Sequence, residues 1–315
     1  GINIRVGPST DPLVASPVLE LGQGRGRAQD RIAMIIIRGL ITDTPTTGLL
    51  GDTTAPIDDL VRQLRLAAED DRVRAVLLRI DSPGGTVAGS ETAYREVRSF
   101  IDRTGKPVVI SMGEVATSGG YYLALAGDHI VAEPSTLTGS IGVIIPTFNA
   151  SEGLSRLGIR THFLTSGPNK DLANPLAPVR EAHYDILQGV VQEYYANFLS
   201  LVLRRRPGLA PDEVAPATDG RVMTGDTAAA IGLVDSIGGV REAMREAMSR
   251  ASLERAVLIR YGPKGNAPRT AYAAIPTPTP EMADQSTNLL RVDAAGLGAG
   301  TLGLRPGVGY YVWIP

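Results

Sequence analysis

The first half of the chain alternates short apolar runs with segments of helical period. Apolar, β-branched runs at residues 31–41, 73–80 and 108–112 predict strands that are buried on both faces. Between them, residues 57–68 and 89–103 fit amphipathic helices, because apolar side chains recur at intervals of three and four. The order strand, helix, strand, helix, strand is typical of right-handed βαβ units. The pattern therefore predicts an α/β fold with a mostly parallel sheet.

The alternation continues as far as residue 251. The elements expected there are a helix that starts at or just after Ser118 and runs to 126, a strand at 129–132, a turn over 138–143 that leads into a fifth strand, a strand at 161–164, a long helix at 181–206, a turn with a short helix and a strand within 220–239, and a helix at 240–251. Three consecutive arginines end the long helix before Pro207. We expect them to be solvated and to favour the helix dipole, and a membrane-surface patch is the alternative.

Shifts in composition divide the chain into three parts. Residues 1–28 are rich in Gly, Pro and Ser without sustained periodicity, and we expect a leader or linker there. Residues 29–255 hold the periodic elements and fit one folded domain. Residues 256–315 form a Pro- and Gly-rich tail, partly extended like polyproline. Its last residues, 310–314, are unexpectedly apolar for a chain end, so we expect them to dock on a surface.

Charge and composition exclude several classes of protein. A net charge of −2 with 20% charged residues argues against a nucleic-acid partner. The chain has no cysteine, which excludes a thiol nucleophile, a disulfide framework and cysteine-ligated metal sites. No apolar run of about 18 residues occurs, so no membrane span is expected within this sequence. The first residue is Gly1 rather than Met, which is compatible with a signal peptide, an anchor or a tag removed upstream.

Two glycine pairs directly follow predicted strands. Gly84-Gly85 comes after the second strand, and Ser118-Gly119-Gly120 comes after the third. Ligands bind at the carboxyl ends of parallel strands, and glycine lets backbone N–H groups approach a ligand closely. A serine at a strand-to-helix turn, facing N–H groups from two turns, is the arrangement of a nucleophile and its oxyanion hole. The alternative is that these are ordinary turn glycines with a helix-capping serine.

A serine nucleophile needs a base, and Lys170 is the candidate that stands out. The three histidines, His129, His162 and His183, each fit a structural or surface role better. Lysine is rare here: of 31 cationic residues only Lys106, Lys170 and Lys264 are lysines. Lys106 and Lys264 lie in segments where lysine or arginine would serve alike. Lys170 lies in a loop after the strand expected at 161–164, and lysine, unlike arginine, can be made to lose its proton. A surface loop lysine is the alternative.

Five segments in the same order resemble one family. They are DSPGG at 81–85, ATSGGYYLA at 116–124, TGSIGV at 138–143, SGPNKD at 166–171, and GRVMTG with GLVDSIGG within 220–239. Together they resemble the signal peptide peptidase A family of serine proteases, also called protease IV or peptidase family S49. The resemblance covers roughly residues 30–250. It fits the short, single-unit form of the family, with both reacting residues in one chain.

The resemblance implies a role for each matching residue. Ser118 matches the nucleophile and Lys170 the general base of a Ser-Lys dyad, and Ser140 matches a serine that orients the lysine. The backbone N–H groups of Gly85 and Gly119 match the oxyanion hole. No cofactor and no metal are implied. The implied fold is ClpP/crotonase-like, with stacked βαβ units and a protruding helix used in oligomerisation, and residues 29–255 would be the catalytic domain.

The resemblance also implies a biological setting. Family members assemble into rings or domes and degrade signal peptides or other short or unfolded peptides at the membrane. The membrane contact would come from an N-terminal segment missing from this chain, which would be soluble as given, with the catalytic domain on the extracytoplasmic side. Two alternatives stay open: a catalytically silent or phage-type relative that acts in assembly, and a crotonase-like acyl-CoA enzyme. The apolar chain end could lie in a neighbouring subunit's substrate groove, or the tail could be a linker.

Overall fold

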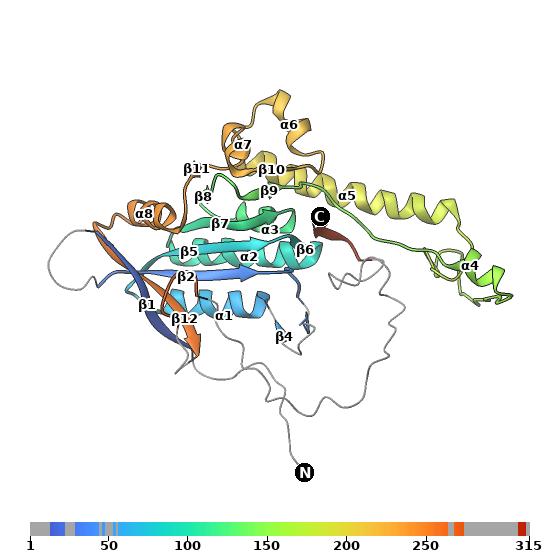
Figure 1. The fold of residues 1–315 in the computed structure, drawn as a ribbon, viewed down its shortest axis with the longest axis horizontal. Coiled ribbons are helices and arrows are strands. Elements are labelled where there is room, and N and C mark those ends of the chain that lie inside the picture. Colours follow the sequence, from blue (N-terminus) through green and yellow to red (C-terminus); the bar gives the residue numbers. More distant parts are fainter. Residues whose placement is uncertain are drawn as a thin grey trace, which may run out of the picture.

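A twisted sheet forms the centre of the molecule (Figure 1). The computed structural model describes residues 13–22, 29–43, 46–47, 53–54, 56–263, 268–273 and 308–312. Within them, the sheet has nine strands: β1 (Leu13–Gly22), β12 (Arg255–Pro263), β2 (Arg31–Arg38), β5 (Val73–Ser82), β7 (Val108–Thr117), β8 (His129–Ala132) and β11 (Ser236–Ile237) in that spatial order, with β9 (Leu137–Gly139) beside β7 and β10 (Val222–Thr224) beside β9. Two small two-stranded sheets are β3 (Thr46–Thr47) with β4 (Thr53–Thr54), and β6 (Gly84–Thr86) with β13 (Tyr310–Val312).

The centre of this sheet is parallel, as the alternating pattern predicts. β2 pairs parallel with β5, β5 with β7, and β7 with both β8 and β9. Helix α1 (Pro56–Glu69) connects β2 to β5, and helix α2 (Val87–Thr104) connects β6 to β7. Ile35, Leu78 and Ile110 on the central strands are fully buried, which explains why these strands are apolar along their whole length. The prediction of an α/β fold is confirmed.

Helices cover both faces of the sheet and create two cores. Helices α1, α2 and α3 (Gly119–Ala124) pack with one face of the strands, where Leu60, Phe100 and Tyr121 are fully buried. Helix α8 (Val240–Arg250) covers the other face and buries Met244 against strands β2, β5 and β7. Each helix turns its apolar face toward the sheet and packs against the apolar side chains of the strands there. The helical spacing of apolar residues in the sequence therefore marks the side of each helix that is buried.

An arm projects from one end of the sheet (Figure 1). It consists of helix α4 (Ser151–Arg156), the turns that follow it, and the first half of helix α5 (Glu181–Arg205). The second half of α5 returns to the core, where Phe198 and Val202 are fully buried. Helices α6 (Pro211–Ala217) and α7 (Gly225–Ala230) follow. The long helix predicted from the sequence is therefore present, and it protrudes.

Several elements differ from the sequence-based expectation. No strand forms at 161–164, because this segment lies in the arm with no strand edge beside it, and Leu164 is 92% exposed. The fifth strand precedes Ser140 instead of following it, since β9 pairs with the end of β7 and Ser140 has a positive φ of 50°. The DSPGG segment does not simply break β5, which continues through Ser82 and is followed at once by β6.

Strands β1 and β12 extend the sheet beyond the expected domain. β1 lies within the segment expected to be a leader, and β12, apart from its first residue Arg255, lies within the segment expected to be a tail. They pair with each other antiparallel, and β12 also pairs parallel with β2. β12 joins the sheet because the edge of β2 offers it backbone hydrogen-bond partners, and β1 then pairs with β12. The composition of the two segments does not indicate this pairing. Lys264 and most of the remaining tail lie outside the described residues.

The arginines that end α5 are used inside the molecule. Arg205 donates to the carbonyl oxygens of Leu125 and Gly127, both at 2.7 Å. Arg206 forms an ion pair with Asp235 at 2.7 Å, and its side chain is only 9% exposed. The expectation that all three arginines are solvated is therefore wrong for Arg205 and Arg206, which are partly buried and have internal partners, whereas Arg204 is exposed. Among the described helices, none is long and apolar enough to cross a membrane.

Candidate active site

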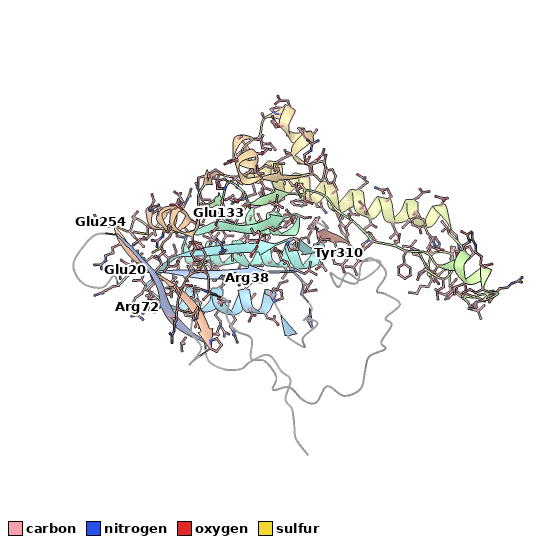
Figure 2. All side chains as sticks on the ribbon, viewed as in Figure 1. Glu20, Arg38, Arg72, Glu133, Glu254 and Tyr310 are labelled. Carbon is pink, nitrogen blue, oxygen red and sulfur yellow. The ribbon has the colours of Figure 1, made fainter. Side chains whose placement is uncertain are left out.

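The carboxyl ends of β5, β7 and β9 meet at one edge of the sheet. Because these strands are parallel neighbours, the residues that follow them gather in space. Thr117 pairs with Gly139 in the β7–β9 register, and the Ser118 N–H donates to the Gly139 carbonyl at 2.8 Å. The site lies near the end of the sheet that carries Tyr310, away from the end with Glu20 and Glu254 (Figure 2).

Ser118 has the features of a reactive serine. Its backbone has φ 50° and ψ −113°, an unfavourable conformation for a residue with a side chain. The residue is 1% exposed, and its Oγ has no hydrogen-bond partner in the described part of the chain. It precedes α3 but makes no side-chain capping bond there. The alternative of an ordinary helix-capping serine is therefore wrong, and a buried, unpaired hydroxyl points to a use outside folding.

Two backbone nitrogens lie in a small space beside Ser118. A Cβ placed on Gly119 would lie 3.0 Å from the Gly85 nitrogen, and a Cβ placed on Gly84 would lie 2.9 Å from the Gly119 nitrogen. Any side chain at Gly84 or Gly119 would therefore fill this space. The structure thus brings together the two N–H groups that the sequence analysis named, Gly85 and Gly119, at the end of β7.

Ser140 lies next to Ser118 on the neighbouring strand end. It follows Gly139 directly, is 7% exposed, and its N–H donates to the Arg221 carbonyl at 2.7 Å. Ser118 and Ser140 share a positive φ of 50°, each immediately after a strand of the parallel pair. Both sharp turns present a serine at the same edge of the sheet.

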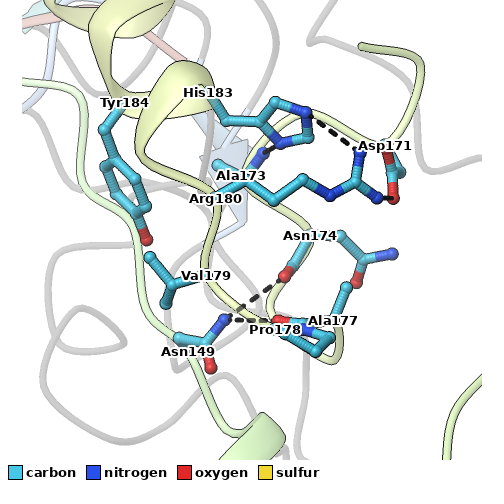
Figure 3. Close-up of a pocket in the computed structure, with 10 residues that line it drawn as sticks. All are labelled: Asn149, Asp171, Ala173, Asn174, Ala177, Pro178, Val179, Arg180, His183 and Tyr184. Atoms are coloured by element: carbon cyan, nitrogen blue, oxygen red, sulfur yellow. Dashed lines mark hydrogen bonds and ion pairs between the residues drawn. The ribbon is translucent and has the colours of Figure 1, made fainter. Parts of the chain in front are cut away.

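Lys170 lies elsewhere, exposed in a turn of the arm. The turn is fastened to the start of α5, because Arg180 pairs with Asp171 at 2.7 Å (Figure 3). The His183 Nε2 also lies 3.0 Å from the Pro168 carbonyl oxygen. Tyr194, further along α5, borders the Ser118 region through Tyr311. At 1.5 Å per residue, His183 and Tyr194 are about 16 Å apart along the helix. Within one chain, the structure does not bring Lys170 to Ser118.

The histidines have structural surroundings. The His129 Nε2 lies 2.8 Å from the Ser236 Oγ, and its Nδ1 lies 3.1 Å from the Arg250 Nη2. Burial lowers the pKa of His129, against the opposing effect of Glu246. His183 holds the turn of Lys170, and His162 is exposed. Among the described residues, no group of three or more acidic, histidine or cysteine side chains could hold a metal ion.

Sequence reasoning missed one polar residue of this site. Ser90, in the first turn of α2, is fully buried, and its Oγ has no hydrogen-bond partner in the described residues. A Cβ on Gly119 would lie 2.3 Å from that oxygen. In the sequence, only its position shortly after the Gly84-Gly85 pair could have indicated that Ser90 belongs to the site. Its contact with Gly119 depends on how α2 packs in the folded chain, which the sequence pattern does not show.

Comparison with known proteins supports the family resemblance. A model described as "Peptidase family S49" matches residues 101–254. A putative signal peptide peptidase SppA of Enterococcus faecium is 32% identical over 75% of this chain and 68% of its own length. The chain belongs to peptidase family S49. The mostly parallel α/β sheet and the protruding helix expected from the resemblance are present in this family member.

Other relatives of this S49 member are longer. Protease 4 of Salmonella typhi is 37% identical over 71% of this chain but only 35% of its own length. The chain thus spans about a third of that relative. The chloroplastic serine protease SPPA of Arabidopsis thaliana is 30% identical over 78% of this chain and 36% of its own length. A membrane-bound stomatin-specific protease is a solved structure with a TM-score of 0.44 and 16% identity, covering 70% of this chain and 86% of that chain.

Proposed function

We propose that this S49 member is a serine endopeptidase with Ser118 as its nucleophile. The observation that carries the proposal is the strained, buried Ser118, whose Oγ has no partner in the described residues and which stands at the turn where the Gly85 and Gly119 nitrogens lie close together. Ser118 also stands immediately before α3, at the end of β7, where its hydroxyl can meet an extended peptide. Membership of a family of serine proteases agrees with this reading.

The proposed reaction is acyl transfer. The Ser118 Oγ attacks a peptide carbonyl carbon while its proton passes to the neutral amine of Lys170, and the N–H groups of Gly85 and Gly119 stabilise the oxyanion. The carbon–nitrogen bond then breaks, and the Lys170 ammonium protonates the leaving amine. Water, deprotonated by Lys170, hydrolyses the acyl-enzyme and regenerates Ser118. Ser140 orients Lys170 from the end of β9.

We propose that Lys170 reaches Ser118 between neighbouring copies of the chain. Each copy presents Lys170 on an exposed arm, distant from its own Ser118. The arm also carries large apolar side chains exposed to solvent, which are typical of an interaction surface: Leu157, Ile159, Phe163, Leu164, Leu176, Val179 and Ile186. A ring or dome of copies would cover these side chains and complete each dyad.

The proposed substrates are signal peptides or other short or unfolded peptides at the membrane. An extended chain fits a site built from backbone edges and glycines, and a folded protein does not. The relative from Enterococcus faecium carries the name signal peptide peptidase. Membrane contact through an N-terminal segment and an extracytoplasmic catalytic domain belong to the same proposal.

Substitution of the two residues tests the dyad. We expect Ser118→Ala, Lys170→Ala and Lys170→Arg to reduce cleavage of a leader peptide to near background, because arginine keeps the charge but cannot act as a base. Ser155→Ala and Arg160→Ala, at exposed positions of the arm, serve as controls and keep wild-type rates. Wild-type activity in Ser118→Ala or Lys170→Arg would contradict the dyad.

Mixing two inactive variants tests the contribution of a neighbouring copy. If Lys170 acts on the Ser118 of another chain, a mixture of Ser118→Ala and Lys170→Ala chains regains part of the activity, because some neighbouring pairs then hold both residues. If the arm folds back within one chain, the mixture stays inactive. An acylating probe that labels Ser118 separates a protease from a silent assembly protein, and CoA binding by calorimetry tests the acyl-CoA alternative.

A further inference from the structure

The hydroxyl of Ser90 is buried next to the candidate active site. A serine inside a helix ordinarily points to solvent or bonds the carbonyl oxygen four residues earlier. Ser90, in the first turn of α2, is fully buried, and its Oγ has no hydrogen-bond partner in the described part of the chain, its own helix included. A buried hydroxyl without a partner lowers stability, so this one points to a use outside folding.

The Ser90 Oγ lies at the space where the two candidate oxyanion donors meet. A Cβ placed on Gly119 would lie 2.3 Å from the Ser90 Oγ and 3.0 Å from the Gly85 nitrogen. The Gly119 nitrogen is bonded to the same Cα atom. Two backbone N–H groups and one side-chain hydroxyl therefore surround a single small space, which Gly119 keeps open by having no side chain.

A peptide carbonyl oxygen fits into this space. The apolar chain end docks within its own chain, since β13 pairs with β6, and the Tyr311 carbonyl oxygen lies 2.9 Å from the same Cβ position on Gly119. Gly85, Ser90 and Gly119 are all buried, so water does not weaken the hydrogen bonds that they offer to such an oxygen. A packing role for Ser90 would need only its volume, which the methyl group of alanine nearly supplies.

We propose that the Ser90 hydroxyl is a third donor to the oxyanion, beside the N–H groups of Gly85 and Gly119. The proposal rests on the proposed function, because it takes Ser118 as the nucleophile. As the Ser118 Oγ bonds to the carbonyl carbon, the electron pair of the C=O π bond moves to the oxygen, and the Ser118 proton passes to the base. The Ser90 O–H donates a hydrogen bond to this oxygen and keeps its own proton. The bond strengthens as the negative charge develops, so it favours the transition state over the bound substrate.

Substitution of Ser90 separates this role from packing. We expect Ser90→Ala to lower kcat and kcat/KM for a leader peptide by the same factor, at least tenfold, because a bond made only in the transition state is lost. Its unfolding temperature should equal or exceed that of the wild type, since an unpaired buried hydroxyl is removed. Ser99→Ala, at an exposed position of the same helix, is the matched control and should keep the wild-type rate. A wild-type rate in Ser90→Ala would overturn the proposal.

Inhibitor binding tests the oxyanion itself and decides the matter if Ser90→Ala is also less stable. A peptidyl trifluoromethyl ketone forms a tetrahedral adduct with a serine, and its oxygen becomes an anion, whereas the corresponding alcohol forms no adduct. Titration followed by ¹⁹F NMR measures the affinity of both without any turnover. We expect Ser90→Ala to weaken binding of the ketone at least tenfold and binding of the alcohol less than twofold. Equal losses for the two compounds, or no loss for the ketone, would overturn the role of Ser90.

Failure of this proposal and failure of the proposed function give different results. Wild-type activity in Ser118→Ala would overturn both, because no serine adduct would then form at this site. An inactive Ser118→Ala chain together with unchanged ketone affinity in Ser90→Ala would leave the serine nucleophile in place and overturn only the third donor.

Discussion

At the scale of single residues, the structure gives Lys106 a role that the sequence does not predict. The sequence predicts that arginine could replace Lys106 and that Lys170 is the lysine with a chemical role. The Lys106 ammonium, however, donates to three carbonyl oxygens at the end of α1, those of Ala67, Ala68 and Asp70, at 2.7, 3.2 and 3.0 Å. A compact ammonium with three donors suits three converging carbonyls, whereas the planar guanidinium of arginine does not. Lys106 is therefore a helix C-terminal cap that prefers lysine.

Substitution of Lys106 should therefore lower the stability of the fold and leave catalysis unchanged. We expect Lys106→Ala to lower the free energy of unfolding by about 1–3 kcal/mol, because hydrogen bonds to a charged group are lost. Lys106→Arg should fall between alanine and wild type. Urea unfolding measures both, with Arg103→Ala, at an exposed site on α2, as the control. If Lys106→Arg matched wild type, the interpretation as a lysine-specific cap would be wrong.

At the scale of elements, an ion pair ties the end of α5 to the sheet. Asp235 accepts from the Ile130 amide of β8 at 2.7 Å and from Arg206, the C-terminal cap of α5, also at 2.7 Å. Burial raises the pKa of Asp235, but the hydrogen bonds and charge of Arg206, with the Ile130 amide, outweigh it and lower the pKa below its usual value. The pair fixes the helix from which the arm projects.

The lowered pKa of Asp235 gives the direction of a pH dependence. Its stabilising effect is fully present above the pKa of an unfolded aspartate, about 3.9, and is lost as the pH falls through the lower, folded pKa. We expect Asp235→Asn to lower the free energy of unfolding by about 1–3 kcal/mol at pH 7. The difference from wild type should shrink as the pH approaches 2, measured by urea unfolding across this range.

Asp219→Asn is the matched control for this pH series. Arg221 lowers the pKa of Asp219 through hydrogen bonds, but the pair lies at the surface, where solvent screens it. Its substitution should therefore change stability less than that of Asp235. An Asp235→Asn effect that grew toward acid pH would contradict the assignment.

At the scale of the whole molecule, the arm and the core have different surfaces. The core buries its apolar side chains in two clusters, whereas the arm exposes Leu157 at 76% and Leu164 at 92%. Leaving such side chains in water is unfavourable, so a structure that does so usually covers them with a partner. The partner we propose is the arm or core of another copy.

Charge placed on the arm tests this surface. We expect Leu157→Asp and Leu164→Asp to reduce the mass of the assembly, measured by analytical ultracentrifugation, and to reduce peptide cleavage with it. The thermal unfolding of each chain should change little, since both side chains are exposed. Val61→Asp places the same charge on a partly exposed position of α1 and should leave the assembly unchanged. An intact assembly with charged arms would rule out this interface.

The sequence by itself determined the parallel core and most helices, and it predicted candidate site residues. Apolar period and β-branched runs suffice for β2, β5 and β7, because strands buried on both faces need apolar residues at every position. The Ser-Gly-Gly and Gly-Gly pairs indicated where backbone and serine would meet. Such features can be predicted locally, because each depends on whether a residue is buried and on which backbone conformations it can adopt.

Only the tertiary structure decided which residues meet. It recruited β1 and β12 to the sheet through an open strand edge, left 161–164 without a strand partner, and separated Lys170 from Ser118 by the length of an arm. It also placed Tyr311 against Gly84 and Gly119, more than 190 positions earlier in the chain. Which strands pair, how far apart two side chains lie and which segment fills a site all depend on contacts between segments that are remote in the sequence. No local sequence pattern predicts these contacts.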